Sequence, residues 1–265
     1  MKKLTTKEIQ NLELAILRAF DRFAKEEHLR WYLAGGTLIG AVRHQGFIPW
    51  DDDIDIMMPR EDYEKMLKTF RHERYRLSEC RNNPEAAIPF AQIYDTQTFL
   101  KWKKVKDPDL GVFIDIFPID GYPENEFAAK IHTRRLWLLR FMNNVARKKL
   151  LRGEKYMVLK RILMLLFRKS PNTYAVRINR LGMKYPFRSS RFVGVTGTTD
   201  HLFKERNLKE AVFAEPDPLL LPFEDLMFPC PSGYDVYLTH LFGDYMQLPP
   251  EEKQVSVHSF TAYEK

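Results

Sequence analysis

The chain has 265 residues, of which 45% are hydrophobic, and it carries a formal net charge of +7. This length and apolar content suffice for one large domain, or for one domain with an elaborated extension. The two cysteines, Cys80 and Cys230, exclude a disulfide framework and favour a reducing compartment.

We expect neither a signal peptide nor a membrane-spanning helix. The basic N-terminus MKKLTTKEIQ is followed by no apolar core, and the longest apolar run is Ile162–Phe167. That run is far shorter than the roughly 20 residues that a spanning helix needs. The predicted localisation is the cytoplasm, either free or attached peripherally to the inner face of the plasma membrane.

Charge is unevenly distributed along the chain. Residues 127–191 hold 18 Lys and Arg and one acid, Glu154, while the rest of the chain carries 24 basic and 34 acidic residues. A basic segment inserted in an acidic body favours an anionic surface or polymer as partner. Nucleic acid would also suit the charge, but no nucleic-acid-binding fold signature accompanies it, so we expect no such partner.

The first predicted elements lead to a glycine turn. Thr5 and Glu8 form a capping-box pattern that predicts a helix over about residues 6–28. A short strand, Trp31–Ala34, comes next, and Gly35-Gly36-Thr37 then forms a tight turn that opens a short helix with Thr37 as its N-cap. Glycines let backbone N–H groups approach an anion, and a helix N-terminus favours phosphate.

A pair of carboxylates follows this turn. Residues 53–56, Asp-Ile-Asp-Ile, read as a strand closed by Pro59, and residues two apart in a strand share a face. Asp53 and Asp55 therefore point together and repel unless a proton or a cation, Mg²⁺ above all, lies between them. A phosphate cradle followed by such a pair predicts a phosphoryl-transfer site. The alternative interpretation is a solvated acidic turn ahead of an ordinary strand.

A third acid stands alone in a later strand. We expect a helix from Arg60 to about Phe70 and then short strands over Tyr75–Leu77, Ile88–Tyr94, Phe99–Trp102 and Val112–Phe117. Asp115 lies within the last of these, and a buried carboxylate is costly without a partner. It is either an ordinary buried Asp bonded to backbone or an Arg, or a third metal ligand.

The rest of the chain predicts helices and then strands. Residues 124–185 read as basic helices, including the more apolar stretch Tyr156–Arg168, and form either a helical subdomain with a solvated basic face or a surface for anionic membranes. The C-terminal part predicts a strand, a hairpin turning at Glu224-Asp225 and a helix ended by Gly243, over Phe192–Thr196, Leu219–Phe228 and Tyr234–Phe242.

Three stretches resemble the LicD family of the nucleotidyltransferase superfamily, which includes bacterial phosphocholine transferases and is related to fukutin-type ribitol-phosphate transferases. They are GGTLIGAVRHQGFIPWDDDIDIMMPREDYEKM from Gly35, FIDIFPIDG from Phe113 and FPCPSGYDVYLTHLFGDYMQLPPEEK from Phe228. The resemblance implies an α+β fold: a nucleotidyltransferase-like mixed sheet with helices, plus a basic helical insertion and C-terminal strands and helix. We expect a catalytic core over 1–123, the basic helical segment over 124–190 and a completing C-terminal part over 191–265.

The resemblance also implies a reaction and its residues. The reaction is the Mg²⁺-dependent, or Mn²⁺-dependent, transfer of phosphocholine from CDP-choline to a hydroxyl of a teichoic acid-like or lipopolysaccharide precursor, releasing CMP. The metal ligands would be Asp53, Asp55 and Asp115, and one of these or Asp52 would take the acceptor proton. The donor phosphates would be bound by Gly35, Gly36 and Thr37, with Arg43 as a phosphate clamp.

Three other functions fit the same residues. They are a nucleotidyltransferase that releases pyrophosphate, a LicD-like transferase of ribitol or glycerol phosphate, and a non-enzymatic membrane-surface binding module. We expect choline rather than a polyol, because aromatic rings, which recognise quaternary ammonium groups, flank the motifs. These rings are Trp50, Trp102, Phe113, Phe117 and Tyr122, and the sequence does not choose among them.

Overall fold

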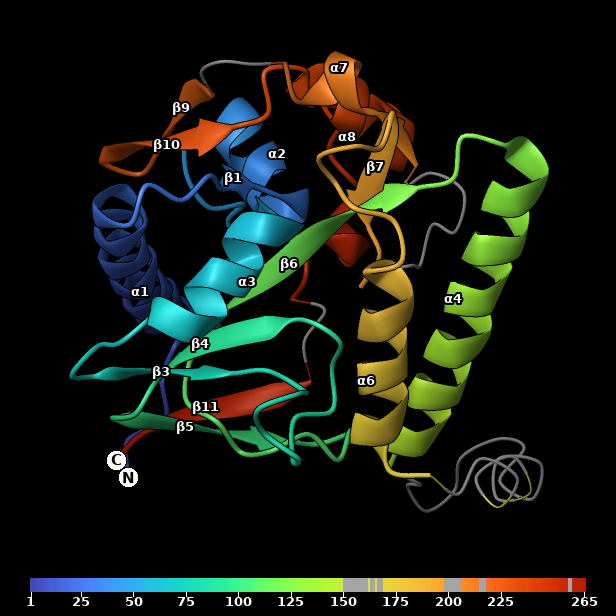
Figure 1. Ribbon diagram of the computed structural model, residues 1–265. Helices are drawn as coiled ribbons and strands as arrows, with labels where there is room; N and C mark the ends of the chain where they lie inside the picture. Colours follow the sequence, from blue (N-terminus) through green and yellow to red (C-terminus); the bar gives the residue numbers. More distant parts are fainter. Residues whose placement is uncertain (150–161, 163–164, 166–168, 198–205, 215–217, 257–258) are drawn as a thin grey trace.

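The computed structural model describes residues 1–149, 162, 165, 169–197, 206–214, 218–256 and 259–265. Within this part of the chain, a seven-stranded mixed sheet is joined by two small two-stranded sheets and flanked by helices (Figure 1). The predicted α+β fold is confirmed. The stretch Tyr156–Arg168 lies outside the described residues, apart from Ile162 and Leu165.

The sheet is built around β6 (Phe113–Tyr122). β2 (Asp55–Pro59) pairs with it in parallel, while β4 (Ala91–Asp95) and β7 (Phe192–Val195) pair with its first and second halves in antiparallel. β6 extends past the predicted end at Phe117, because β2 and β7 both hydrogen-bond to the residues that follow. Three outer strands complete the sheet: β1 (Tyr32–Leu33) on β2, β3 (Tyr75–Ser78) on β4 and β8 (Asn207–Leu208) on β7.

Three helices of the N-terminal half pack on this sheet. α1 (Thr6–Glu26) begins with the predicted capping box and contacts β4 and β6, and α3 (Arg60–Thr69) contacts β2 and β6. α2 (Gly35–His44) joins β1 to the acidic loop before β2. The apolar residues of α1 and of the inner strands share one core. The ends of β2 and β6 that carry acids lie at the margin of this core.

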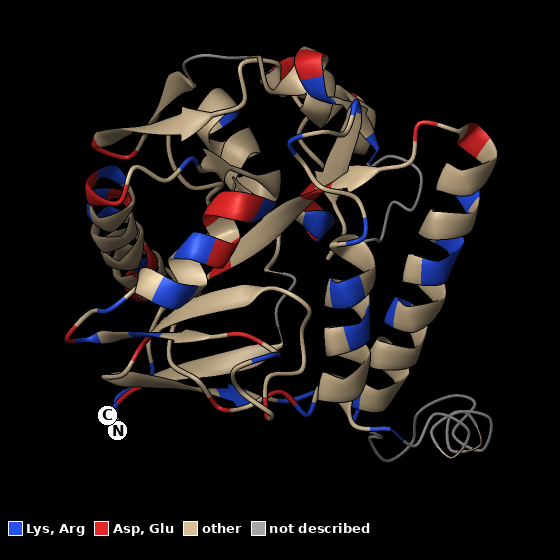
Figure 2. Cartoon of the chain, viewed as in Figure 1, with Lys and Arg blue, Asp and Glu red and all other residues tan. Residues whose placement is uncertain are grey.

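Two basic helices stand side by side at one flank of the molecule. α4 (Glu126–Arg147) packs against α6 (Pro171–Gly182), and both carry Lys and Arg along their lengths (Figure 2). A buried polar network fastens α6 to the sheet: Arg60 forms a double hydrogen bond with Asp120, at 2.7 and 2.8 Å, and also donates to Asn179 of α6 at 3.3 Å. The basic segment is thereby held on the seven-stranded sheet. No helix in the described ranges has the length and apolar character to cross a membrane.

The C-terminal elements close the fold. α7 (Lys209–Val212) precedes the hairpin of β9 (Leu219–Phe223) and β10 (Leu226–Cys230), which turns at Glu224-Asp225 as predicted, and α8 (Tyr234–Phe242) ends at Gly243 as predicted. The short helix η1 (Glu251–Lys253) follows, and β11 (Phe260–Glu264) then pairs with β5 (Thr98–Trp102). The termini lie close together (Figure 1).

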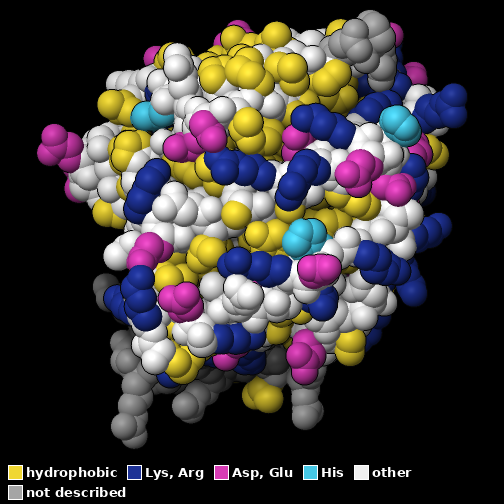
Figure 3. All heavy atoms as spheres, turned by 90° about the vertical axis from the view of Figure 1, so that its left-hand side faces the viewer, with side chains coloured by type: hydrophobic (Ala, Val, Ile, Leu, Met, Phe, Trp, Pro, Cys, Tyr) yellow, Lys and Arg dark blue, Asp and Glu magenta, His cyan; other side chains and the backbone are white. Residues whose placement is uncertain are grey.

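The face that carries α1 mixes charges of both signs below a strip of hydrophobic side chains (Figure 3). This strip covers the β9–β10 hairpin, where Leu220 and Met227 are each about half exposed. The division of the chain into residues 1–123, 124–190 and 191–265 stays a proposal.

Candidate active site

The N-terminus of α2 lies directly against carboxylates. A Cβ added to Gly35 would lie 3.0 Å from Asp55 Oδ2, and one added to Gly36 would lie 2.9 Å from Asp51 Oδ2. Gly35 also has φ +50°, a backbone conformation that is strained for a residue with a side chain. The positive φ therefore favours glycine at Gly35, whereas a side chain at Gly36 would require the carboxylate of Asp51 to move. The N–H groups of the first helical turn have no partner within the helix, so they and the carboxylates border one site.

Thr37 is not the N-cap of this helix, and that prediction was wrong. Ala34 is the N-cap, because the positive φ of Gly35 starts the helix three residues earlier. Thr37 is the third helical residue, buried, and its Oγ1 accepts a hydrogen bond from the backbone N–H of Asp55 at 2.8 Å. Its side chain thus ties α2 to the first residue of β2. Contact of Thr37 with a donor phosphate remains a prediction.

Two of the predicted ligands are neighbours on adjacent strands. Asp55 and Asp115 are register partners in the parallel ladder of β2 and β6, and both are half-buried. Partners in such a ladder project to the same face of the sheet. The side-chain amide of Gln92 donates a 2.8 Å hydrogen bond to Asp115 Oδ1. This contact orients one carboxylate oxygen and leaves Asp115 facing the same side as Asp55.

The loop before β2 adds a compact acidic group. Ligand atoms of Asp51, Asp52 and Asp53 lie within 4.8 Å of one another, and Ser256 Oγ donates to Asp52 Oδ2 at 2.5 Å. β2 begins at Asp55 rather than at Asp53 as predicted, because its parallel ladder with β6 begins at the pair of Asp55 and Asp115. The alternation of half-buried acids with buried isoleucines nevertheless continues back to Asp53. Oxygen ligands at this spacing suit a hard divalent cation.

Glu13 is an acid of this region that the sequence reasoning missed. It projects from α1, is 2% exposed, and its Oε2 has no hydrogen-bond partner within the described chain. Burial, and then the negative charges of Asp53, Asp52 and Asp51, raise its pKa well above the ordinary value. A signal was present in the sequence, because Glu13 stands at helical spacing between Ile9 and Ile16 on the apolar face of the helix.

A prediction for stability follows from Glu13. Because its folded-state pKa lies above the unfolded value, folding favours its protonated form, and stability falls as pH rises above the ordinary Glu range. We expect Glu13→Gln to raise the melting temperature at neutral pH in metal-free buffer and to reduce the fall in melting temperature between acid and neutral pH. Thermal melts of both proteins across pH in chelator measure this effect.

The same helix offers the control. The ion pair with Lys2 and the capping box lower the pKa of Glu8 to about 2. The carboxylate of Glu8 therefore stabilises the fold above the unfolded pKa, and Glu8→Gln should lower the melting temperature at neutral pH. A change of the same sign for both variants would contradict the role given to Glu13.

Arg43 lies at the other end of α2 from the glycines. Its Nη1 donates to the backbone oxygens of Tyr245 at 2.6 Å and Gln247 at 3.3 Å. Eight residues of helix separate it from Gly35, about 12 Å along the axis. In this arrangement Arg43 fastens the segment after α8 to α2. Its role as a phosphate clamp remains a prediction.

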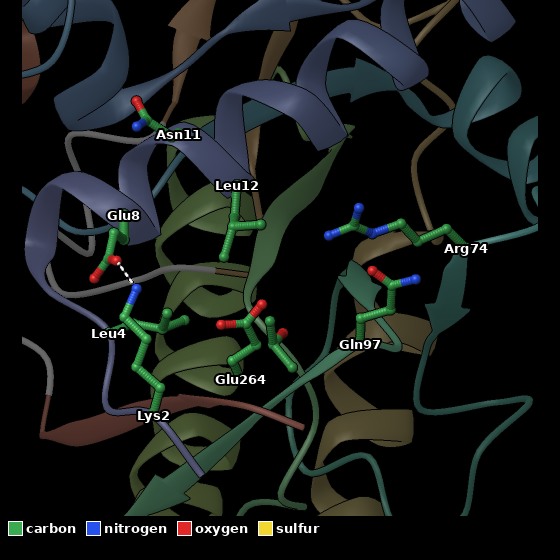
Figure 4. A pocket seen from close by; sticks show the side chains of 9 residues that line it. Lys2, Leu4, Glu8, Asn11, Leu12, Arg74, Gln97 and Glu264 are labelled. Atoms are coloured by element: carbon green, nitrogen blue, oxygen red, sulfur yellow. Dashed lines mark hydrogen bonds and ion pairs between the residues drawn. The ribbon is translucent and has the colours of Figure 1, made fainter.

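A separate pocket of about 250 Å³ lies where the chain termini meet α1 (Figure 4). Its lining includes Glu8 and Leu12 of α1, and Lys2 and Glu8 form an ion pair at its rim. Gln10, also on α1, instead donates to the backbone oxygen of Asp51 at 2.8 Å. α1 therefore serves this pocket and the acidic loop with different side chains.

Residues 28–162 match the family described as LicD/FKTN/FKRP, nucleotidyltransferase domain. Over 99% of both chains, the protein is 32% identical to the lipopolysaccharide cholinephosphotransferase LicD of Haemophilus influenzae. The chain belongs to the LicD/FKTN/FKRP family. A second relative, the uncharacterized protein RT0683 of Rickettsia typhi, is 35% identical over 38% of this chain and 32% of its own length.

Family membership makes the protein an enzyme, a phosphotransferase of LicD type. The interpretation as a non-enzymatic binding module was therefore wrong. The matched residues include α2, the acidic loop and the whole of β6, whereas Glu13 lies outside the match. The site described above thus lies mainly within the nucleotidyltransferase domain, with Glu13 and Ser256 contributed by the flanking segments.

Proposed function

We propose that this enzyme transfers phosphocholine from CDP-choline to a hydroxyl group of a cell-surface glycan precursor, teichoic acid-like or lipopolysaccharide, and releases CMP. The observation that carries the proposal is that the first turn of α2 lies close to Asp51 and Asp55. A Cβ added to Gly36 would lie 2.9 Å from Asp51 Oδ2, and one added to Gly35 would lie 3.0 Å from Asp55 Oδ2. An anion-binding helix end beside carboxylates suits a phosphate with its cation. The name of the full-length relative supports choline as the cargo and a glycan as the acceptor.

The acids present fit a divalent cation. All are oxygen donors, as Mg²⁺ prefers, with Mn²⁺ as an alternative, and the orphaned oxygen of Glu13 lies buried behind them. We infer that Asp53, Asp55 and Asp115 hold one or two ions. When bound, the ions neutralise charge on the donor phosphates and on the departing CMP.

The protein groups then have distinct tasks. The N–H groups of Gly35, Gly36 and Thr37 bind donor phosphate oxygens and align the phosphorus that bears choline. The acceptor oxygen bonds to that phosphorus, the bond to the CMP oxygen breaks, and a carboxylate takes the acceptor proton. Asp52 suits this last task, because Ser256 holds one of its oxygens at 2.5 Å and orients the other.

Product analysis tests the proposal. We expect incubation with CDP-choline, Mg²⁺ and glycan acceptors to release CMP in step with phosphocholine transfer, and chelator to stop it. Pyrophosphate release from CTP and phosphocholine would instead identify a nucleotidyltransferase. CMP release from CDP-ribitol or CDP-glycerol alone would identify a transferase of another group. Absence of CMP with every CDP-alcohol tested would overturn the proposal.

The basic segment supports a second proposal, attachment to an anionic membrane surface that presents the acceptor. Arg147 and Lys149 are not free for this, since Arg147 donates to Asp107 at 2.8 Å and Lys149 donates to the backbone oxygen of Trp102 at 3.0 Å. The exposed outer side of α4 instead carries both basic and apolar residues: Lys130, Arg134, Arg135, Trp137 and Leu138. Basic side chains beside exposed apolar ones suit an anionic lipid surface.

Vesicle flotation tests this attachment. We expect binding to anionic vesicles at low salt that weakens as salt is added, because each basic residue near the surface contributes about 1 kcal/mol. Replacing Lys130, Arg134 and Arg135 by Glu should abolish flotation without changing CMP release with a soluble acceptor. Failure of the unaltered protein to float at low salt would leave a helical subdomain with a solvated basic face.

A further inference from the structure

A second hollow lies beside the acidic loop. Its volume is about 390 Å³, within the roughly 300–1,000 Å³ of small-ligand pockets. It is an open hollow bordered by the middle and end of α2, the loop before Asp51, and the end of α8 with the segment that follows it. Three aromatic side chains from these segments contribute to its lining: Trp50, Phe242 and Tyr245.

The pocket begins about one helical turn from the candidate phosphate site. Gly36, Ile39 and Arg43 share a face of α2, since residues three and seven positions apart in a helix align. Gly36 meets Asp51 at 2.9 Å, and Ile39, about 4.5 Å further along the axis, lines the pocket. On the opposite wall, Trp50 directly precedes Asp51 in the chain. A group joined to a bound phosphate by a short arm would reach this pocket.

The structure also argues against the other aromatic rings that were candidates for binding choline. Trp102 and Phe113 both pack on Phe260, with ring centroids 5.2 and 6.3 Å away. Phe117 packs on Phe90 at 4.5 Å, and Tyr122 is 1% exposed. Phe113, Phe117 and Tyr122 are buried in the core, and the half-buried Trp102 packs against the small core cluster that includes Phe113. Trp50 is half-buried and lines a pocket next to the acids.

The charge and hydrogen-bonding character of the lining favour a quaternary ammonium. Asp244 supplies a carboxylate, and Gln247 supplies the one side-chain amide among the lining residues. Arg43 also lines the pocket, but it donates to two backbone oxygens of the opposite wall. A trimethylammonium has no N–H to donate and is recognised by aromatic faces and diffuse negative charge. A polyol would need several converging donors and acceptors, which this lining lacks.

We propose that this pocket, the choline pocket, binds the trimethylammonium group of the donor, with Trp50 as the principal aromatic face and Asp244 as the counter-charge. The inference rests on the proposed function and deepens it, because it names the residues that select choline over ribitol or glycerol. Tyr245 supports the wall: it is buried, and its hydroxyl donates to Asp235 at 2.7 Å.

Trp50→Leu and Asp244→Asn test the choline pocket, and Trp50→Phe is the conservative comparison. We expect Trp50→Leu to weaken phosphocholine binding by up to about thirtyfold, measured by calorimetry in Mg²⁺ buffer, and Asp244→Asn to weaken it less. Trp50→Phe should retain most of the affinity, because an aromatic face remains. In kinetics, the loss should appear in KM for CDP-choline, and the preference for CDP-choline over CDP-ribitol should shrink by a similar factor.

The control is Phe127→Leu, which removes an exposed aromatic side chain at the start of α4 that does not line the pocket. It should change neither phosphocholine affinity nor donor preference, and circular dichroism and melting temperature should show every variant folded. Unchanged affinity in folded Trp50→Leu, with CMP still released from CDP-choline by the unaltered enzyme, overturns the choline pocket alone. Failure of the unaltered enzyme to release CMP from CDP-choline overturns the proposed function instead.

Discussion

Asp53→Asn, Asp55→Asn and Asp115→Asn should each lower turnover by several powers of ten while leaving the melting temperature unchanged or higher. Each substitution replaces a charged oxygen ligand with a neutral amide, and a bound metal contributes several kcal/mol of transition-state stabilisation. Every 1.36 kcal/mol corresponds to a factor of ten in rate. Stability should not fall, because these acids lie crowded with Asp51, Asp52 and Glu13, and removing one charge relieves repulsion.

The measurements are the initial rate of CMP release, Mg²⁺ affinity by calorimetry and the melting temperature. Asp225→Asn is the matched control, because Asp225 is an exposed acid of the hairpin turn paired only with Arg18 in the described contacts. It should keep turnover and metal affinity. Turnover near that of the unaltered enzyme in any of the three variants would remove that residue from the metal site.

Asp120→Asn should instead lower the free energy of unfolding by about 3–5 kcal/mol, the usual cost of breaking a buried ion pair from one side. Asp120 lies on β6 only five residues after Asp115, but it is fully buried and accepts two hydrogen bonds from Arg60 and one from Thr196. Without this negative charge, the buried guanidinium of Arg60 loses its closest carboxylate and keeps Glu64, at 3.2 Å, as an ion-pair partner. Urea unfolding followed by circular dichroism measures the loss.

A double variant distinguishes the loss of the ion pair itself from the cost of leaving one of its charges buried. Arg60→Met with Asp120→Leu removes both charges, so it should recover part of the stability that Asp120→Asn loses. Asp115→Asn on the same strand serves as the comparison, since it should affect turnover and leave the unfolding free energy intact. An unfolding free energy unchanged by Asp120→Asn would show that this network does not hold α6 on the sheet.

Local elements were largely determined by short-range sequence signals. The capping box of Thr5 and Glu8 placed the start of α1, and Gly243 placed the end of α8. Each signal works through residues three or four positions apart, so a helix end is legible without the rest of the fold. The glycines at the start of α2 could be recognised for the same reason, although the N-cap of this helix was assigned three residues late.

Elements that form only beside a segment distant in the sequence could not be predicted from the sequence. β8, α7 and β11 are short and carry weak periodicity, and they form because β7, β8 and β5 lie beside them. Asp53 alternates with isoleucines as a strand would, but it falls outside β2 because the ladder with β6 begins at Asp55. Strand formation needs a hydrogen-bonding neighbour, and the pattern of one segment does not specify how far that neighbour extends.

The sequence by itself selected the residues for which we propose a chemical role: two glycines at the start of a helix, a run of aspartates and one acid in an apolar strand. Only the tertiary structure decided which of these meet. The pairing of β2 with β6 puts Asp115 beside Asp55, the packing of α1 buries Glu13 behind the acidic loop, and the return of the chain after α8 sets Tyr245 near Trp50. Periodicity reports the face on which a side chain lies, whereas the burial of apolar surface across the whole chain selects what that face packs against.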